Sequence, residues 1–217
     1  MISSPLLASI PNILHSFGTR DEESPPERLV TSRQVHGTEI YFAKEAGPPA
    51  QGGFDILLTD QAGVAVGVKT ADCLPVLIVE PGLGVVAAAH AGWRGTLRGV
   101  AAKAVTRILE LDGHADRLAA ALGPSIGPCC YEVGEEVAAA LEKELPDFSG
   151  QILVRKSEKK WMLDLPLANR LQLMEKGVRP ERIDRIDLCT RCRPDLFHSF
   201  RRDHEAAGRM VSFIQLL

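Results

Sequence analysis

Two histidines and one cysteine stand where apolar, strand-like segments give way to turns. They are His36 in RQVHGTEI, Cys73 in KTADCLPVLI and His90 in AAAHAGWRG, separated along the chain by 37 and then 17 positions. Side chains at such breaks converge at the rim of a sheet. Two imidazoles and a thiolate form the protein ligand set of a catalytic zinc, which keeps a fourth position for water or substrate. The spacing is not that of a compact finger motif, so the residue types alone leave a shared metal site and three unrelated residues both open.

Two residues beside these breaks have alternative roles. Asp72 is either a proton acceptor that also orients a ligand or a cap of the turn's backbone. Arg94 either contacts an anion or is a solvated side chain at a helix start. The glycines near His90 allow close approach of the backbone, and a helix beginning after Gly95 would turn its positive end toward an anion such as phosphate.

The C-terminal half adds arginines and thiols. Arg201 and Arg202 in SFRRD either bind phosphate in bidentate fashion or pair with the acidic residues that follow them. Cys129 and Cys130, in GPSIGPCCYEVG, are either small packed residues or part of the wall of the site. The CTRC motif at 189–192 invites a redox or zinc interpretation. With no second pair recognised to complete four ligands, we predict free thiols there.

The overall composition narrows the classes of protein. Of 217 residues 45% are hydrophobic and 24% charged, the net charge is −3, and no basic block stands out. Nucleic acid and anionic membranes are therefore not expected as partners, and no protein partner is indicated. No apolar run reaches the ~18 residues of a membrane span, and the N-terminus lacks a secretory pattern. Five cysteines are an odd number, so we expect a reducing cytoplasm with thiols free or bound to metal.

Periodicity predicts an α+β fold in which mixed β-sheet layers are flanked by helices. The charged segment 19–34 and the segment 44–53 are expected to be exposed loops, and neither is a convincing linker, so residues 1–217 are taken as one compact domain. Helix patterns begin after Gly95 and end near Gly113, run from Glu135 to Leu145 before Pro146, and run from Pro166 to Gly177. Strand patterns, several of them apolar enough for burial on both faces, cover 54–60, 63–70, 74–80, 83–90, 183–188 and 210–217.

Seven blocks of the sequence together resemble the YfiH-like family, also known as laccase-domain proteins. The blocks are RQVHG, KTADCLPVLI, AAHAGWRGT, LGPSIGPCCYEVGEEV, WMLDLPLANRLQL, LCTRC and FHSFRRDHEAAGRM, and the resemblance extends from about Phe17 to the C-terminus. It implies that His36, Cys73 and His90 bind zinc, with copper as the alternative ion. The family's glycine-rich N-terminal segment is shortened here, although Arg20 keeps the position of its substrate-contacting arginine.

The resemblance implies phosphorolysis of purine nucleosides, namely adenosine, inosine, guanosine and methylthioadenosine, with adenosine deamination alongside. A nucleoside and phosphate are then the partners, with Arg20, Arg94, Cys129 and Arg201 as candidate substrate contacts. Cys73 and Asp72 are candidate catalytic groups, and Glu132 is a second candidate proton donor.

Three other functions stay open. A copper-dependent polyphenol oxidase would need a histidine cluster for dioxygen, but only four other, scattered histidines remain. A peptidoglycan-precursor editing hydrolase would use Cys73 as a nucleophile or a metal-activated water. A non-enzymatic zinc domain is disfavoured because structural sites are usually closed by a fourth ligand.

Overall fold

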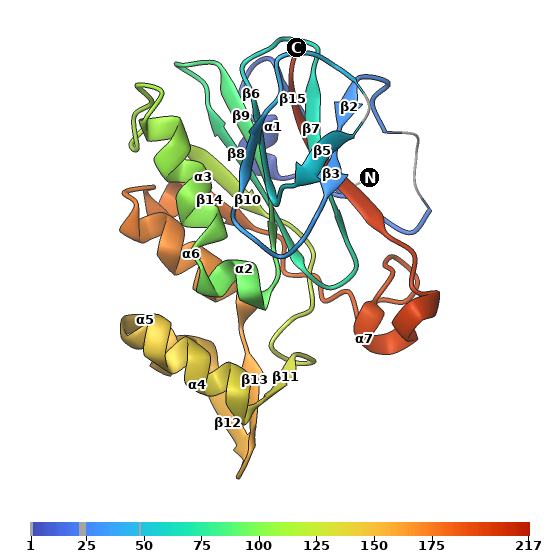
Figure 1. Ribbon diagram of the computed structural model, residues 1–217, viewed down its shortest axis with the longest axis vertical. Helices are drawn as coiled ribbons and strands as arrows, with labels where there is room; N and C mark the ends of the chain where they lie inside the picture. The colour runs from blue at the N-terminus through green and yellow to red at the C-terminus, as the bar shows by residue number, and fades with distance from the viewer. Residues whose placement is uncertain (1, 22–24, 48) are drawn as a thin grey trace.

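Two stacked β-sheets and a layer of helices build most of the molecule (Figure 1), which is described here from a computed structural model. The structure describes residues 2–21, 25–47 and 49–217. The larger sheet has the order β14-β10-β8-β9-β6-β4 and the smaller β1-β15-β7-β2. The larger sheet comprises β4 (Ile40–Phe42), β6 (Ile56–Thr59), β8 (Leu74–Glu80), β9 (Val85–Ala91), β10 (Ala119–Leu122) and β14 (Ile183–Arg185). The smaller comprises β1 (Ile13–Ser16), β2 (Leu29–Val30), β7 (Ala65–Thr70) and β15 (Met210–Leu216).

Both sheets mix parallel and antiparallel neighbours. The pairs β10–β14, β4–β6 and β2–β7 are parallel, whereas β8–β9, β8–β10, β6–β9, β7–β15 and β1–β15 are antiparallel. The predicted α+β class with mixed sheet layers is therefore confirmed. All six predicted strand patterns contain a strand.

Strand β8 shows why the apolar runs lack alternation. Its Val76 and Ile78 pack with the helices, while Leu77 and Val79 pack with residues of the smaller sheet. Because both faces of the larger sheet are covered, every side chain of β8 and β9 is buried. The ends of these strands are consequently held in fixed positions.

The helices differ from the predicted pattern at two places. The helix expected after Gly95 is two helices, α2 (Trp93–Leu97) and α3 (Val100–Leu109), because Gly99 between them has φ +72°. Gly95 thus lies inside α2 rather than before it. The predicted helix from Glu135 is α4 (Glu135–Glu144), but Pro146 begins a further helix, α5 (Pro146–Ile152), as proline can at a first helical position. The third prediction is confirmed as α6 (Leu165–Glu175).

A small unit at the tapered end of the molecule was not predicted (Figure 1). It joins α4 and α5 to a sheet of β11 (Glu132–Gly134), β13 (Lys160–Leu163) and β12 (Leu153–Ser157). Its apolar core, which includes Val133 and Leu141, packs against Trp93 and Leu97 of α2. This unit therefore supports α2, the helix that follows the His90 strand.

The remaining elements are short. They are α1 (Pro5–Ala8), β3 (Ser32–Arg33), β5 (Ala50–Gly53), the 3-10 turns η1 (Pro180–Arg182) and η2 (His204–Ala206), and α7 (Phe200–Asp203). Strands β3 and β5 form a small parallel pair inside the segments expected to be loops, of which residues 22–24 and 48 lie outside the described part of the chain. Within that part, none of the helices has the length and hydrophobicity needed to cross a membrane.

Candidate functional site

The structure brings His36, Cys73 and His90 together at one rim of the larger sheet. Cys73 immediately precedes β8, and His90 lies near the end of β9, where it is paired with Pro75 of β8. His36 reaches the same place from the turn after β3. One ligand atom from each of the three side chains lies within 4.8 Å of the others, and the two imidazole centroids are 4.8 Å apart. Residues remote in the sequence thus meet closely enough to contact a single ion.

Asp55, a wholly buried residue just before β6, holds the side chain of His90 and the backbone of His36. Its Oδ1 lies 2.7 Å from Nδ1 of His90, which leaves Nε2 of that ring as the ligand atom. The backbone N–H groups of Val35, His36 and Gly37 donate to the same carboxylate at 3.0, 3.1 and 2.8 Å. These bonds retain His36 at φ +58°, a left-handed conformation unusual for a non-glycine residue. A carboxylate that orients a metal-binding histidine is a common support of metal centres.

Burial and neighbouring charges shift the pKa values of His90, His36 and Asp55. Burial alone would lower the pKa of His90, but the Cys73 thiolate and the Asp55 carboxylate outweigh burial and raise it to about 9. Burial and the neighbouring positive charge of His90 lower the pKa of His36. The carboxyl of Asp55 is also buried, yet its hydrogen bonds from His90, Gly37 and Val35 hold its pKa below the usual value. The site therefore combines a stabilised anion with one imidazole, His90, whose extra proton a cation would displace and one, His36, that is more readily neutral.

The donor set and the space around it fit a divalent transition metal. Nitrogen and thiolate sulfur are ligands that zinc prefers, and copper accepts the same set. A Cβ atom on Gly92 would lie 2.8 Å from Nδ1 of His36 and 3.0 Å from Sγ of Cys73. Glycine at this position thus leaves open a space beside two of the three candidate ligands that any larger residue would fill.

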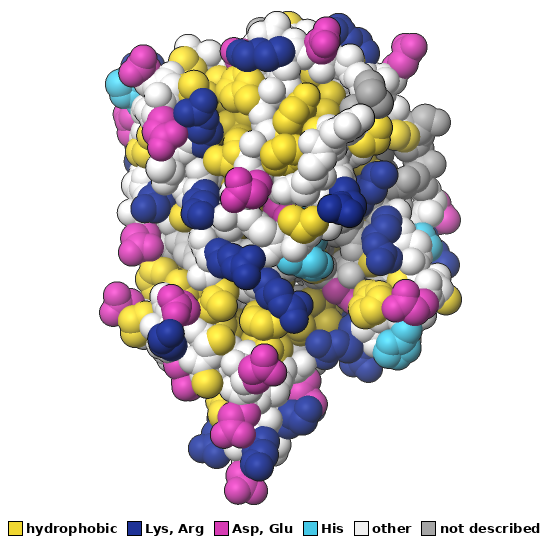
Figure 2. Space-filling model, viewed as in Figure 1, with side chains coloured by type: hydrophobic (Ala, Val, Ile, Leu, Met, Phe, Trp, Pro, Cys, Tyr) yellow, Lys and Arg dark blue, Asp and Glu magenta, His cyan; other side chains and the backbone are white. Residues whose placement is uncertain are grey.

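A cavity of about 560 Å³ opens above the three side chains. Four basic residues line it: Lys69, Arg94, Arg201 and Arg209. Basic side chains gather around the middle of the face shown in Figure 2, between the two large sheets and the tapered end. The other described lining residues are Ser32, Gln34, His36, Thr70, Ala71, Asp72, Cys73, His90, Trp93, Ile126, Tyr131, Leu165 and Phe200.

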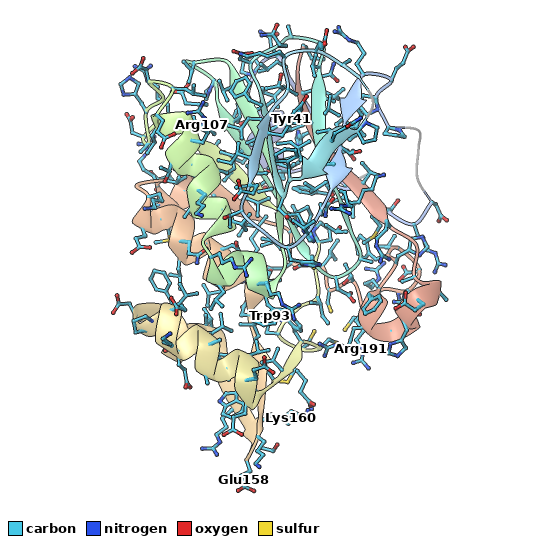
Figure 3. All side chains as sticks on the ribbon, in the orientation of Figure 1. Tyr41, Trp93, Arg107, Glu158, Lys160 and Arg191 are labelled. Carbon is cyan, nitrogen blue, oxygen red and sulfur yellow. The ribbon has the colours of Figure 1, made fainter. Side chains whose placement is uncertain are left out.

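Aromatic rings hold two of the arginines against the wall. The guanidinium of Arg94 lies 4.5 Å from the ring centroid of Trp93, and that of Arg201 lies 5.2 Å from the ring of Tyr131. Arg201 also donates from Nη1 to the backbone carbonyl of Glu132 at 2.9 Å. In Figure 3, Trp93 projects from α2 into the region between the large sheets and the tapered end. Such stacking reduces the freedom that a guanidinium loses when it binds an anion.

Known proteins resemble this chain in sequence and in fold. The sequence profile of the family described as multi-copper polyphenol oxidoreductase laccase matches residues 18–217. The chain belongs to this family. The purine nucleoside phosphorylase YlmD of Geobacillus stearothermophilus is 42% identical over 200 residues, which cover 88% of this chain and 73% of the relative. The adenosine deaminase RL5 of an unknown prokaryotic organism is 35% identical, covering 86% and 74% of the two chains.

A solved structure of this laccase family has the same fold. The crystal structure of YlmD from Geobacillus stearothermophilus superposes with a TM-score of 0.88 at 32% sequence identity, covering 98% of this chain and 94% of that one. The resemblance expected from the seven sequence blocks is thereby confirmed. The named activities of these relatives identify an enzyme family.

Asp72, the residue before Cys73, lies in a network of hydrogen bonds at this laccase-family site. Its carboxylate accepts hydrogen bonds from Oγ1 of Thr190 at 2.6 Å, Oγ of Ser199 at 3.0 Å and the backbone N–H of Arg201 at 2.6 Å. Its backbone φ is +92°, a strained value for a non-glycine residue. Because its oxygens accept three hydrogen bonds, Asp72 anchors the turn that presents Cys73. It ties this turn to the segments around 190 and 200.

Two of the predicted substrate contacts lie elsewhere. Arg20 donates to the carbonyl of Pro194 and is not among the residues that line the cavity. Cys129, also outside the lining, belongs to a cluster with Cys130, Cys189 and Cys192, whose four sulfur atoms lie within 4.8 Å of one another. The CTRC cysteines form no disulfide. The statement that no second pair completes four ligands is wrong, because the adjacent cysteines of the other segment form that pair.

Glu132, the second candidate proton donor, lies outside the lining residues as well. Its carboxylate pairs with Nζ of Lys156 at 2.7 Å and Nζ of Lys160 at 3.5 Å, and the hydrogen bond from Lys156 lowers its pKa. These contacts keep Glu132 ionised in the three-stranded sheet of β11, β13 and β12.

Sequence reasoning missed several residues of the site, among them Asp55, Tyr131 and Arg209. Asp55 stands directly before a wholly buried strand, the kind of strand end that drew attention to Cys73 and His90, so the signal was present. Tyr131 and Arg209 carried no local signal beyond their places in two of the family blocks. Burial, followed by the negative charge of Cys73, raises the pKa of Tyr131, so its phenol keeps its proton.

Proposed function

We propose that this protein is a zinc-dependent purine nucleoside phosphorylase, which transfers the ribosyl group of a purine nucleoside to phosphate. The proposal rests on one observation. The same cavity is lined by the three candidate metal ligands, four cationic side chains and three aromatic rings. The names of several relatives, including YlmD, support the same reaction. The candidate ions are zinc and copper, and the donor set of two imidazoles and one thiolate favours zinc.

Phosphate binding is assigned to the cationic side of the cavity. Arg94 and Arg201 are restrained by Trp93 and Tyr131, and a planar guanidinium donates two parallel hydrogen bonds to a phosphate. The one carboxylate among the described lining residues, Asp72, is already bonded to three donors, which reduces its repulsion of an anion. Two restrained arginines can orient phosphate toward C1′ of the ribose, which lowers the entropic cost of the reaction.

The purine is assigned to the aromatic side, where Trp93, Tyr131 and Phe200 supply flat apolar surfaces. Tyr131 keeps its phenolic proton because its pKa is raised, and it can donate a hydrogen bond to the departing base. His36, Cys73 and His90 would hold the ion, and a bound zinc supplies a Lewis acid with a vacant coordination position. Asp55 orients His90, and Asp72 positions the turn that carries Cys73.

Adenosine deamination is a second candidate, because the 35% identical relative RL5 is named an adenosine deaminase. The same cavity can place C6 of adenine beside the metal. A multicopper oxidase is not proposed, since it requires a cluster of imidazoles. The two metal-capable groups found in the described part of the chain contain two histidines between them.

The test is an assay of the purified zinc protein with adenosine, with and without phosphate. Phosphorolysis releases adenine and ribose 1-phosphate only when phosphate is present, whereas deamination releases ammonia and inosine without it. Arg94→Gln should raise the KM for phosphate about tenfold or more. Arg98→Gln is the matched control, because Arg98 is exposed one helical turn further on and does not line the cavity.

Cys73→Ser should abolish both activities. Turnover of a muramyl-peptide substrate alone would assign the site to cell-wall editing instead. Retained zinc without turnover of any of these substrates would refute an enzymatic role.

A further inference from the structure

Four cysteines form a second cluster, separate from the cavity, at the carboxyl ends of two neighbouring strands. Strands β10 and β14 are paired in parallel, so the segments that follow them leave the sheet on the same side. Cys129 and Cys130 lie on the first segment, and Cys189 and Cys192 on the second. A bridge between Ser125 and residue 189 holds the segments together near their bases.

The sulfur atoms have the separations of a tetrahedral thiolate site. Zn–S bonds of about 2.3 Å at tetrahedral angles place the sulfurs about 3.8 Å apart. Sγ of Cys192 lies 3.7 Å from that of Cys129 and 3.3 Å from that of Cys130, and all four sulfurs lie within 4.8 Å of one another. A disulfide would need about 2.05 Å, and all four residues are free thiols.

Polar donors lie against two of the four sulfurs, those of Cys189 and Cys130. The backbone N–H of Gly127 donates to Sγ of Cys189 at 3.3 Å, and the N–H of Cys192 donates to the same sulfur. The side chain of Arg191 contacts Cys130. Cys129 and Cys192 are exposed, an unusual position for cysteine, which is among the most buried residue types. Amide donors and a guanidinium compensate the negative charge that four thiolates leave around a divalent cation.

From this geometry we infer that Cys129, Cys130, Cys189 and Cys192 bind a structural zinc ion, distinct from the ion expected at His36, Cys73 and His90. The four sulfurs close the coordination sphere, which is the property of a structural rather than a catalytic site. This inference does not depend on the proposed phosphorylase activity.

The cluster stabilises one wall of the cavity. Thr190, inside the CTRC motif, donates to Asp72, and Nη1 of Arg202 donates to the carbonyls of Thr190 and Arg191. The other cysteine pair lies between Ile126 and Tyr131, which line the cavity. In Figure 3, Arg191 lies close to α7, the helix that carries Arg201. A zinc ion here would tie both segments together on the far side of Asp72 from Cys73.

The experiment counts zinc per chain, by elemental analysis of protein purified without chelators under reducing conditions. The expected contents are two for the wild type, one for Cys73→Ser, one for Cys192→Ser and none for the double variant. Arg193→Ser is the matched control and should keep two, because Arg193 is on the same turn but its side chain pairs with Asp195. Cobalt loaded into Cys73→Ser should give the intense visible and charge-transfer absorption of a tetrahedral tetrathiolate.

The Cys73→Ser arm separates this inference from the proposed function, since it lacks the other site and keeps all four cluster cysteines. It also covers the case in which Cys192→Ser does not fold. Zinc absent from folded Cys73→Ser, iron in its place, or a disulfide between the two segments in freshly purified reduced protein would each overturn the inference.

Discussion

Replacing Asp55 by asparagine tests how the candidate metal centre is held. Asp55 Oδ1 serves His90 and the backbone N–H of His36, and Oδ2 serves the N–H groups of Val35 and Gly37. An asparagine of the same shape has one oxygen, so its NH₂ group must face one of these two pairs of donors. Two donors then lose their acceptor at a position where no part of the Asp55 side chain is exposed.

The magnitude follows from that count. A donor left without an acceptor costs about 1–3 kcal/mol, and because Val35 itself is exposed, the lower half of that range applies to its N–H. We expect Asp55→Asn to reduce the free energy of unfolding by about 2–5 kcal/mol, and the Tm by roughly 10 °C for a chain of this size. Loss of the carboxylate behind His90 should also weaken zinc binding about 10- to 100-fold.

Thermal unfolding and competition for zinc against a chromophoric chelator measure the two effects. Asp60→Asn is the matched control, because Asp60 follows the other end of β6 and pairs with exposed Lys44. It should change neither quantity appreciably, since exposed ion pairs contribute about 0–1 kcal/mol. The reasoning is refuted if Asp55→Asn keeps the wild-type zinc affinity and Tm, or if Asp60→Asn loses as much.

Four further outcomes are expected. Gly92→Ala should lower zinc occupancy by elemental analysis at little change in Tm, because its Cβ would enter the space beside Cys73; full occupancy would contradict this. Tyr131→Phe should lower kcat about 10²-fold with the ring retained, and an unchanged kcat in steady-state assays would remove the phenol from the reaction. Thr190→Val, which loses its 2.6 Å bond to Asp72, should raise the KM for phosphate several-fold while zinc content stays constant, and a fall in zinc content would assign it another role. Burial lowers the pKa of His15, whose Nε2 accepts a hydrogen bond from a backbone N–H at 2.9 Å. As the pH falls, the unfolded state therefore binds a proton at this residue before the folded state does, and the Tm should fall below about pH 6.5. The His15→Gln variant should lack this dependence of Tm on pH.

The sequence predicted the parts of the fold that rest on continuous hydrophobic runs. The strands around Cys73 and His90 are buried on both faces, so their composition alone distinguishes them from helices and loops. The unit of β11–β13 was missed because its strands are short and of mixed polarity; β12, which is mostly exposed, reads LVRKS, with a single apolar pair. The break at Gly99 was missed because apolar spacing continues across it, and only the positive φ of the glycine divides the helix.

The candidate metal ligands were predictable from residue type, whereas the residues that hold them were not. An imidazole or a thiolate at a strand end is rare enough to be noticed, but an aspartate at a turn is common and usually caps the backbone. Asp55 is such a cap, for residues 35–37, and through the same carboxylate it also orients His90. Both roles depend on the pairing of distant strands, which local sequence does not encode.

The cysteine cluster also depends on the pairing of strands that are distant in the sequence. Each of its two segments looks incomplete alone, since a four-ligand site needs two pairs, and the pairs are brought together only by the parallel contact of β10 with β14. One hydrogen bond, from Thr190 to Asp72, then links this cluster to the turn before Cys73. The two groups differ in the feature that separates structural from catalytic metal sites: four sulfurs close one sphere, while three ligands facing a cavity leave the other open. Hydrogen bonds from Thr190, Ser199 and Arg201 hold Asp72 at φ +92°, and Asp72 positions the turn that presents Cys73 to the cavity.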